Sequence, residues 1–321
     1  MTGRYVRRLA LIATMGVVAP LASLSAASPA LAAPKGIFAR FAQCPLATFK
    51  ALGVPPEAAL CSFNETLGGE VAIGSTKVPI NSGVNAGKTI TLQGGAVPTG
   101  NPENPKEYFV LPAANGESMS KTELNVPGGL LDLVNCEEIK GKGIWETIER
   151  GTCKAIFENK TTGVTATTEI VANATNPSIL NVRALSRETG TALVLPVRVH
   201  LKNPLLGNSC YIGSEASPIE MRLTTGATSP KSPNKSISGA FGDPETLEEN
   251  ELTLLRVTND SLVDNAFSVP VAEGCGEFFS FLIDPLVDSK LKLPSEDGYN
   301  TAILNGTLNT ATAEAVEASE K

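Results

Sequence analysis

Apolar and polar side chains alternate along residues 191–203, which read TALVLPVRVHLKN. One face of an extended strand would carry Leu195, Val197, Val199 and Leu201, and the other Arg198, His200 and Lys202. A two-residue period with one apolar face predicts a half-buried β-strand. The segments IEMRLTTG, KTITLQGG, YFVLP and TATTEIVAN are also rich in strand-forming residues, and stretches such as NSGVNAG, TGNPENP and FGDPE predict turns between them. The chain is therefore predicted to be all-β, with sandwich-like sheets.

Two similar stretches suggest an internal duplication. AIGSTKVPI at residues 72–80 and CYIGSEASPI at residues 210–219 share Ile-Gly-Ser and, after three residues, Pro-Ile. Three further pairs of segments recur in the same order, which predicts two similar β-sandwich-like halves, residues 33–175 and 176–321, with a few short helices. The alternative is a β-rich composition that aligns with itself. If the duplication is real, Gly74 and Gly213 should turn the chain at equivalent strand ends, and Ile80 and Ile219 should face the core.

One segment has a helical period instead. In CGEFFSFLIDPLVD, residues 275–288, the apolar residues recur at three- and four-residue spacing, which predicts a short amphipathic helix. Its apolar face would consist of Phe278, Phe279, Leu282, Ile283, Leu286 and Val287. Pro285 is expected to kink or end this helix, because proline lacks the N–H group that an interior position requires.

The first 32 residues have the pattern of a secretory signal peptide. Three arginines precede the apolar run LALIATMGVVAPLASLSA, and the small residues Ala30 and Ala32 follow it. Pro20 and Ser23 interrupt the run, which disfavours a membrane anchor. The mature chain is therefore expected to begin near Ala33, to lack an integral membrane segment, and to be secreted or held at the cell envelope.

Six cysteines follow the signal peptide: Cys44, Cys61, Cys136, Cys153, Cys210 and Cys275. An even number of cysteines in an exported chain indicates disulfides, although six cysteines allow 15 connectivities. Sequential pairing is predicted, as Cys44–Cys61, Cys136–Cys153 and Cys210–Cys275, because the first two pairs have equal spacing. A zinc site is disfavoured because the chain has no Cys-x-x-Cys motif and a single histidine.

Charge and composition exclude some partners and offer few catalytic groups. The formal net charge of −7 and the absence of a basic run in the sequence argue against binding to nucleic acid. His200, the only histidine, is expected to be a solvated surface residue rather than part of a nucleophilic site. The acidic run DPETLEENE, residues 243–251, is expected to be a solvated connector, since it lacks the spacing of a calcium loop. No cofactor is predicted.

Four carboxylates lie close together in the sequence: Asp260, Asp264, Asp284 and Asp288. Asp264 lies in an otherwise apolar stretch, where it or Asn265 is expected to bind the backbone. The favoured function is therefore a non-catalytic structural or binding role at the cell envelope or outside the cell, with a cell-wall or extracellular component as a possible partner. The alternative is a glycosidase-like extracellular hydrolase that uses a carboxylate pair near Asp264.

Several motifs together resemble those of predicted secreted proteins of high-GC actinobacteria, for which no activity is known. They are ITLQGG, VPGGLLDL, HLKNPLLGNSCYIGS, LTTGATSP, LVDNAFSVP and LPSEDGYNTAILNGTL, and they extend over most of the mature chain. The resemblance implies export and a bacterial source. It implies no activity and no site residues.

Overall fold

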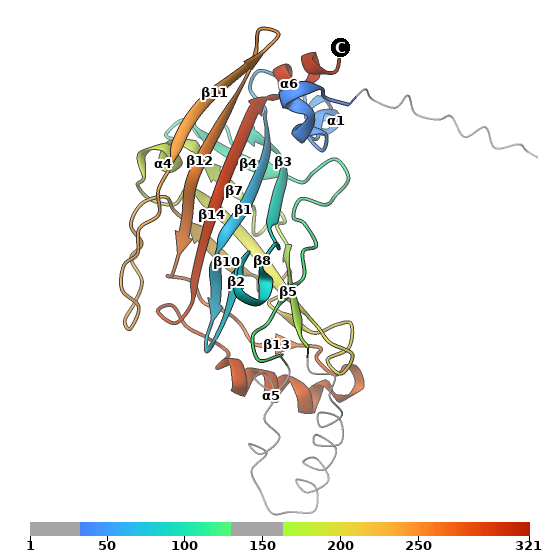
Figure 1. Cartoon of the computed structure of the whole chain (residues 1–321), viewed down its shortest axis with the longest axis vertical. Helices are drawn as coiled ribbons and strands as arrows, with labels where there is room; N and C mark the ends of the chain where they lie inside the picture. Colours follow the sequence, from blue (N-terminus) through green and yellow to red (C-terminus); the bar gives the residue numbers. More distant parts are fainter. Residues whose placement is uncertain (1–32, 130–162) are drawn as a thin grey trace, which may run out of the picture. The chain divides into compact units, whose positions relative to one another are not determined.

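The structure, a computed structural model, describes residues 33–129 and 163–321. The predicted signal peptide and the predicted Cys136–Cys153 pair lie outside the described residues. The described residues form one compact unit. Strands dominate it and its helices are short, so the all-β prediction is confirmed (Figure 1).

The strands are β1 Leu60–Ile73, β2 Thr76–Ile80, β3 Ile90–Pro98, β4 Glu107–Leu111, β5 Leu124–Asn125, β6 Thr165–Ile170, β7 Ile179–Asn181, β8 Leu193–Lys202, β9 Tyr211–Ile212, β10 Ile219–Leu223, β11 Asp243–Glu249, β12 Leu252–Asp264, β13 Ala272–Glu273 and β14 Thr301–Thr312. The α-helices are α1 Leu46–Ala51, α4 Val182–Arg187, α5 Ser280–Leu291 and α6 Ala313–Ser319. Short 3-10 helices are η1 Gly36–Phe41, η2 Gly83–Asn85 and η4 Glu277–Phe279.

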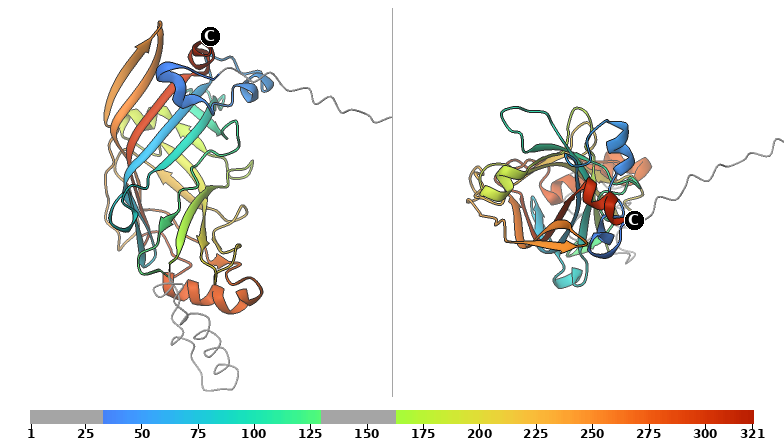
Figure 2. Two further views of the ribbon diagram at one scale, coloured as in Figure 1. Left: turned by 45° about the vertical axis from the view of Figure 1, so that its right-hand side comes forward. Right: turned by 90° about the horizontal axis from the view of Figure 1, so that it is seen from above.

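The strands form one antiparallel sheet that curls and closes on itself. Its main path runs β11-β12-β14-β1-β3-β4-β7-β8-β6-β5, and β10 pairs with the free edge of β8. Just beyond β10, Thr224 exchanges two backbone hydrogen bonds with Val263 of β12, of 2.9 and 2.8 Å. Ala240 and Ser261 exchange two more beside them. These short contacts, here called the seam, complete a ring of strands around a common interior (Figure 2).

The internal duplication is not confirmed. β1 pairs with β14 and β6 pairs with β8, so strands from both expected halves lie in the same sheet. Gly74 and Gly213 do adopt positive φ values, of 52° and 81°, and Ile80 and Ile219 are fully buried. However, β2 folds back on β1 as a hairpin, whereas β10 pairs with β8.

The alternation in residues 191–203 is confirmed. Four alternate residues of β8 are at most 7% exposed, and Arg198, His200 and Lys202 on the other face are half-buried. The inward residues are Leu195, Val197, Val199 and Leu201. They belong to the larger apolar cluster, inside the ring. A second cluster, which contains Phe38, Phe49 and Val316, packs η1, α1 and α6 against the outer face of the sheet.

Two of the three predicted disulfides lie in the described residues, and both are present. Cys44–Cys61 fastens the segment between η1 and α1 to β1, in the outer cluster. Cys210–Cys275 joins the chain before β9 to the chain after β13, and both of its cysteines are fully buried in the inner cluster. The described part of the chain contains no free cysteine.

The predicted amphipathic helix is present as α5, but its buried face is narrower than expected. Ile283, Leu286 and Val287 are buried, whereas Phe278 and Phe281 are 91% and 74% exposed. Phe278 lies in the 3-10 helix η4, before α5 begins. The three- and four-residue spacing of an α-helix therefore does not predict which way its side chain points. Pro285 lies inside α5 instead of ending it, on the exposed side, where solvent can satisfy the carbonyl group that it leaves without a donor.

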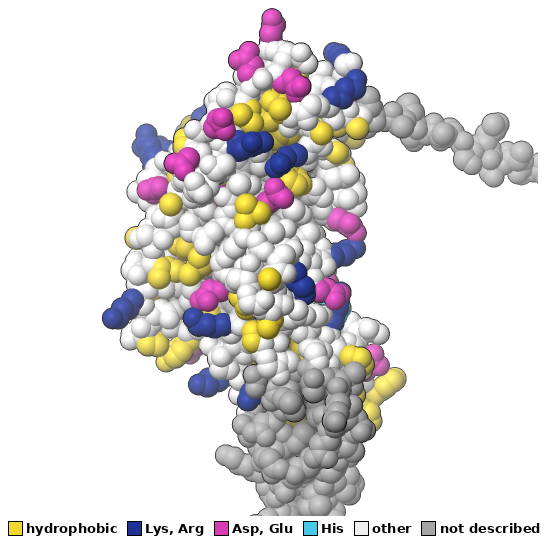
Figure 3. Space-filling model, in the orientation of Figure 1, with side chains coloured by type: hydrophobic (Ala, Val, Ile, Leu, Met, Phe, Trp, Pro, Cys, Tyr) yellow, Lys and Arg dark blue, Asp and Glu magenta, His cyan; other side chains and the backbone are white. Residues whose placement is uncertain are grey.

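Residues 243–249 form β11 and are not the connector that the acidic composition suggested. β11 pairs with β12 along its whole length and ends the path of strands. An exposed edge with several carboxylates resists pairing with another chain, which accounts for acidic residues in a strand. On the face that Figure 3 shows, acidic and basic side chains are interspersed. Within the described residues, no helix has the length and apolar character needed to cross a membrane.

Candidate functional site

The ring of strands encloses a cavity of about 630 Å³. Side chains from β1, β3, β4, β7, β8, β10, β12 and β14 line it. The two-residue period explains which ones: on β1, Leu60, Ser62 and Asn64 point inward, while Cys61 and Phe63 pack in the outer cluster. Cavities of this size accommodate small organic ligands.

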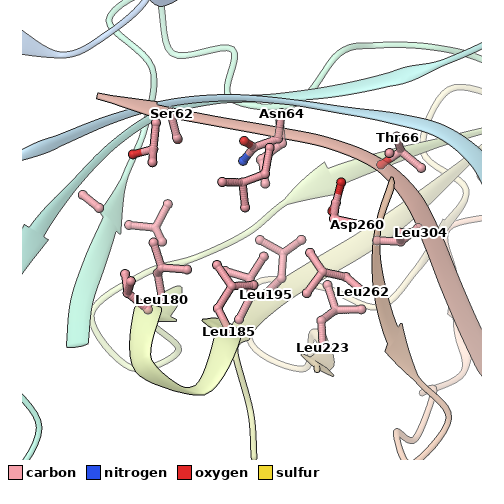
Figure 4. A pocket seen from close by; sticks show the side chains of 18 of the residues that line it. Ser62, Asn64, Thr66, Leu180, Leu185, Leu195, Leu223, Asp260, Leu262 and Leu304 are labelled. Atoms are coloured by element: carbon pink, nitrogen blue, oxygen red, sulfur yellow. The ribbon is translucent and has the colours of Figure 1, made fainter. Parts of the chain in front are cut away.

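Most of the cavity wall is aliphatic. The leucines labelled in Figure 4 are Leu180, Leu185, Leu195, Leu223, Leu262 and Leu304. Leu180, Leu262 and Leu304 are only half-buried, although each lies on the inner side of its strand. Their remaining exposure is toward the cavity, so this apolar surface has no protein partner. Filling it with an apolar molecule would be favourable, at about 25 cal/mol per Å² removed from water.

A polar stripe crosses one side of this wall. Ser62, Asn64 and Thr66 follow one another on β1, and Asp260 of β12 lies across from them (Figure 4). Thr66 and Asp260 are both in register with Gly306 of β14, which runs between their strands. The cavity therefore offers hydrogen-bonding groups on one side and leucines on the other.

Two β-bulges produce this arrangement. The register of β1 against β14 shifts between Thr66 and Gly68, and that of β12 shifts between Thr258 and Asp260. An extra residue reverses the alternation of inward and outward side chains beyond it. In β12 the extra residue is Asn259, with φ of 57°. Asp260 consequently points into the cavity together with Leu262.

Two positions near the bulges have no room for a side chain, so both must be glycine. A side chain at Gly306 would collide with the carbonyl oxygen of Glu65, and one at Gly242 would collide with the carbonyl oxygen of Thr258. Asn259 is held from the other side, because its Nδ2 donates to Oδ2 of Asp243 at 2.8 Å. The inward direction of Asp260 is thus fixed by close backbone packing.

Asp260 is a buried carboxylate with few hydrogen bonds to offset the cost of its burial. It is 8% exposed, and no hydrogen bond from another described residue reaches it. Burial raises the pKa of Asp260 to about 6, although a contact with its own backbone amide opposes that shift. A ligand that carries a hydrogen-bonding group could satisfy Asp260.

The other three carboxylates have backbone partners. Oδ2 of Asp264 accepts the Arg222 N–H at 2.6 Å, and Oδ1 accepts the Ala266 N–H at 2.9 Å, as expected for a residue that binds the backbone. Asp284 and Asp288 accept N–H groups in and next to β13. Burial raises the pKa of all three, and these hydrogen bonds oppose the shift. None of the three lines the cavity.

His200 is more enclosed than the sequence suggested. It lies on the outer side of β8, and its side chain is only 12% exposed. The His200 and Tyr211 rings stack with their centres 4.4 Å apart, and the guanidinium carbon of Arg198 lies 4.3 Å from the centre of the Tyr211 ring. Burial lowers the pKa of His200, although Glu169 nearby opposes that effect. Tyr211 from β9 shields His200 from solvent. The residue pattern of β8 alone cannot indicate this contact, because Tyr211 comes from another strand.

The cavity reaches solvent beside α4. Five residues, here called the mouth, line the cavity there: Lys106, Arg183, Ser186, Arg187 and Phe241. All except the half-buried Phe241 are exposed. The helix begins at the Asn181 side chain, which accepts the N–H of Ala184 at 2.9 Å. The Thr225 hydroxyl fastens it by donating to the Leu185 carbonyl at 2.7 Å, and Leu185 itself points into the cavity.

No family model, curated protein or solved structure matches this chain. Among the described residues, no group of three or more His, Cys, Asp or Glu side chains is arranged to hold a metal ion. The cavity and its mouth are therefore the features of the described residues that indicate a function.

Proposed function

We propose that this protein is an exported, non-catalytic binding protein that holds a small, mainly apolar molecule inside its closed sheet. The observation that carries the proposal is the cavity of about 630 Å³, with half-buried leucines whose exposed surface faces it. Two disulfides and the signal-like first 32 residues support export, since disulfides persist in oxidising compartments.

The carboxylates favour binding over hydrolysis. A glycosidase requires two carboxyl groups that flank the bond to be cleaved. Of the described residues that line the cavity, Asp260 and Glu65 are the acidic ones. The Glu65 carboxylate is engaged by Arg40 at 3.2 Å, and Asp264 is occupied by two backbone N–H groups. The hydrolase alternative therefore has less support than a binding role.

A bulky side chain in the cavity should weaken binding. Leu304→Trp places an indole where Leu304 now faces open space, so the affinity for a neutral lipophilic dye such as Nile red should fall at least about tenfold. Fluorescence titration of the purified mature protein measures it. Solvent extraction and mass spectrometry of the protein from its native host would identify a bound natural ligand.

Ile303→Trp is the matched control, because Ile303 precedes Leu304 on β14 and does not line the cavity. We expect this variant to bind the dye within about twofold of the unmodified protein. Thermal unfolding of both variants shows whether they fold. Unchanged dye binding by a folded Leu304→Trp variant, or absence of binding by the unmodified protein, would contradict the proposed function.

A further inference from the structure

We propose that the ligand is an anionic amphiphile, with its apolar tail in the cavity and its anionic head at the mouth. This inference rests on the proposed binding function and specifies the chemical class of the ligand. It is carried by three basic residues at the mouth, Lys106, Arg183 and Arg187, and by Asp260, a buried carboxylate of the cavity wall.

The three basic residues are held together by the fold. Arg183 and Arg187 are four residues apart on α4, so they lie on one side of the helix. The backbone N–H of Val182 donates to the carbonyl of Lys106 at 3.0 Å, which fixes the start of β4 against the start of α4. All three residues are exposed, and all three line the cavity.

None of the three basic residues at the mouth forms an ion pair within the described residues, whereas several basic residues elsewhere do, namely Arg40, Lys50, Lys77, Lys121, Arg198, Lys202 and Arg222. The neighbouring carboxylates have other partners. Glu188 accepts the Phe241 N–H at 2.8 Å, and Glu107 accepts hydrogen bonds from Thr99, Asn101 and Asn104.

Like charges four residues apart destabilise a helix, and this effect acts on Arg183 and Arg187. An anion bound between them would remove that repulsion and would form charge-assisted hydrogen bonds with the guanidinium groups. A net positive group at the mouth is notable in a chain whose formal net charge is −7. The mouth therefore favours a negative group over a neutral or a positive one.

Asp260 determines the orientation of the ligand. A carboxylate or phosphate head placed beside Asp260 would meet a like charge in a poorly solvated interior, which is unfavourable. The same head at the mouth meets three positive charges and remains in contact with water. The leucines of the cavity wall suit an aliphatic tail. A cationic head would instead bind at Asp260, and this is the outcome that contradicts the inference.

Three probes with the same tail distinguish these possibilities: dodecanoate, dodecanol and dodecylamine. Each is titrated against the full mature protein that carries Nile red, and displacement of the dye reports its affinity. We expect dodecanoate to bind at least about tenfold more tightly than dodecanol at low salt. That advantage should shrink as the salt concentration rises, because exposed charges are screened.

Charge reversal tests the residues. Arg183→Glu/Arg187→Glu should weaken dodecanoate at least about tenfold and leave dodecanol within about twofold. Lys231→Glu/Lys235→Glu is the matched control. It changes the net charge by the same amount at two exposed lysines that do not line the cavity, and it should leave both affinities unchanged.

Equal binding of dodecanoate and dodecanol, or tightest binding of dodecylamine, would overturn the inference and leave the proposed function standing. An equal loss of dodecanoate in the control variant would also overturn it, because the effect would then come from net charge alone. Failure of the unmodified protein to bind the dye or any of the three probes would instead refute the proposed function itself.

Discussion

Removal of the Cys210–Cys275 disulfide by Cys210→Ala/Cys275→Ala should lower the free energy of unfolding by about 4 kcal/mol. The two cysteines are 65 residues apart, and a disulfide that closes a long loop restricts the unfolded chain more than one that closes a short loop. The enclosed segment contains β10, β11 and β12, and thus both sides of the seam. The sulfur atoms are also buried in the inner cluster, so their removal leaves a void that adds to the loss.

Urea unfolding of the purified mature protein measures this loss. The control is Cys44→Ala/Cys61→Ala, which opens a loop of 17 residues and should cost about 3 kcal/mol. A smaller loss for the 65-residue loop than for the 17-residue loop would show that chain entropy does not govern the difference.

The second large effect concerns Asp260. Its pKa rises from 3.8 in the unfolded chain to about 6 in the folded protein. The folded state therefore binds more protons than the unfolded state between these values, so stability falls as the pH rises through this window and is constant above it. The loss is about 3 kcal/mol in total. Asp260→Asn removes the buried charge, and it should raise the free energy of unfolding at pH 8 by up to about that amount.

Asp264→Asn is the control for this prediction, since Asp264 lies on the same strand and its pKa is also raised. Its two oxygens accept two backbone N–H groups, and an asparagine can accept only with one. This variant should therefore lose about 1–3 kcal/mol. Urea unfolding between pH 4 and pH 8 measures both variants. A loss of stability at pH 8 for Asp260→Asn, similar to that for Asp264→Asn, would show that Asp260 has a partner that stabilises its charge.

Local features of the fold could be predicted from the sequence, because they depend on neighbouring residues. The inward face of β8 follows from a two-residue period, and α5 follows from a helical period. The pairings of Cys44 with Cys61 and of Cys210 with Cys275 follow from their order along the chain. Each of these inferences needs only one segment, or the order of six cysteines.

The closed ring and its cavity could not be predicted, because they depend on distant pairings. β1 and β14 are neighbours in the sheet although they lie near opposite ends of the described chain. The inward direction of Asp260 depends on a bulge at Asn259, and the residue pattern of β12 does not predict that bulge. The mouth likewise forms only when β4 brings Lys106 next to α4. A carboxylate near Asp264 was noticed in the sequence, but the structure places Asp260 and not Asp264 at the cavity.

The seam affects how quickly a ligand can leave. Strands such as β1 and β14 are joined along twelve residue pairs, whereas the seam is closed by four backbone hydrogen bonds beyond the end of β10. Local opening of a protein begins where the fewest contacts must break. Separation of Thr224 and Val263 would widen the cavity beyond its mouth, so the lifetime of a bound molecule would depend on this opening as well as on its contacts with the cavity wall. Amide hydrogen exchange at these two residues would report that opening directly.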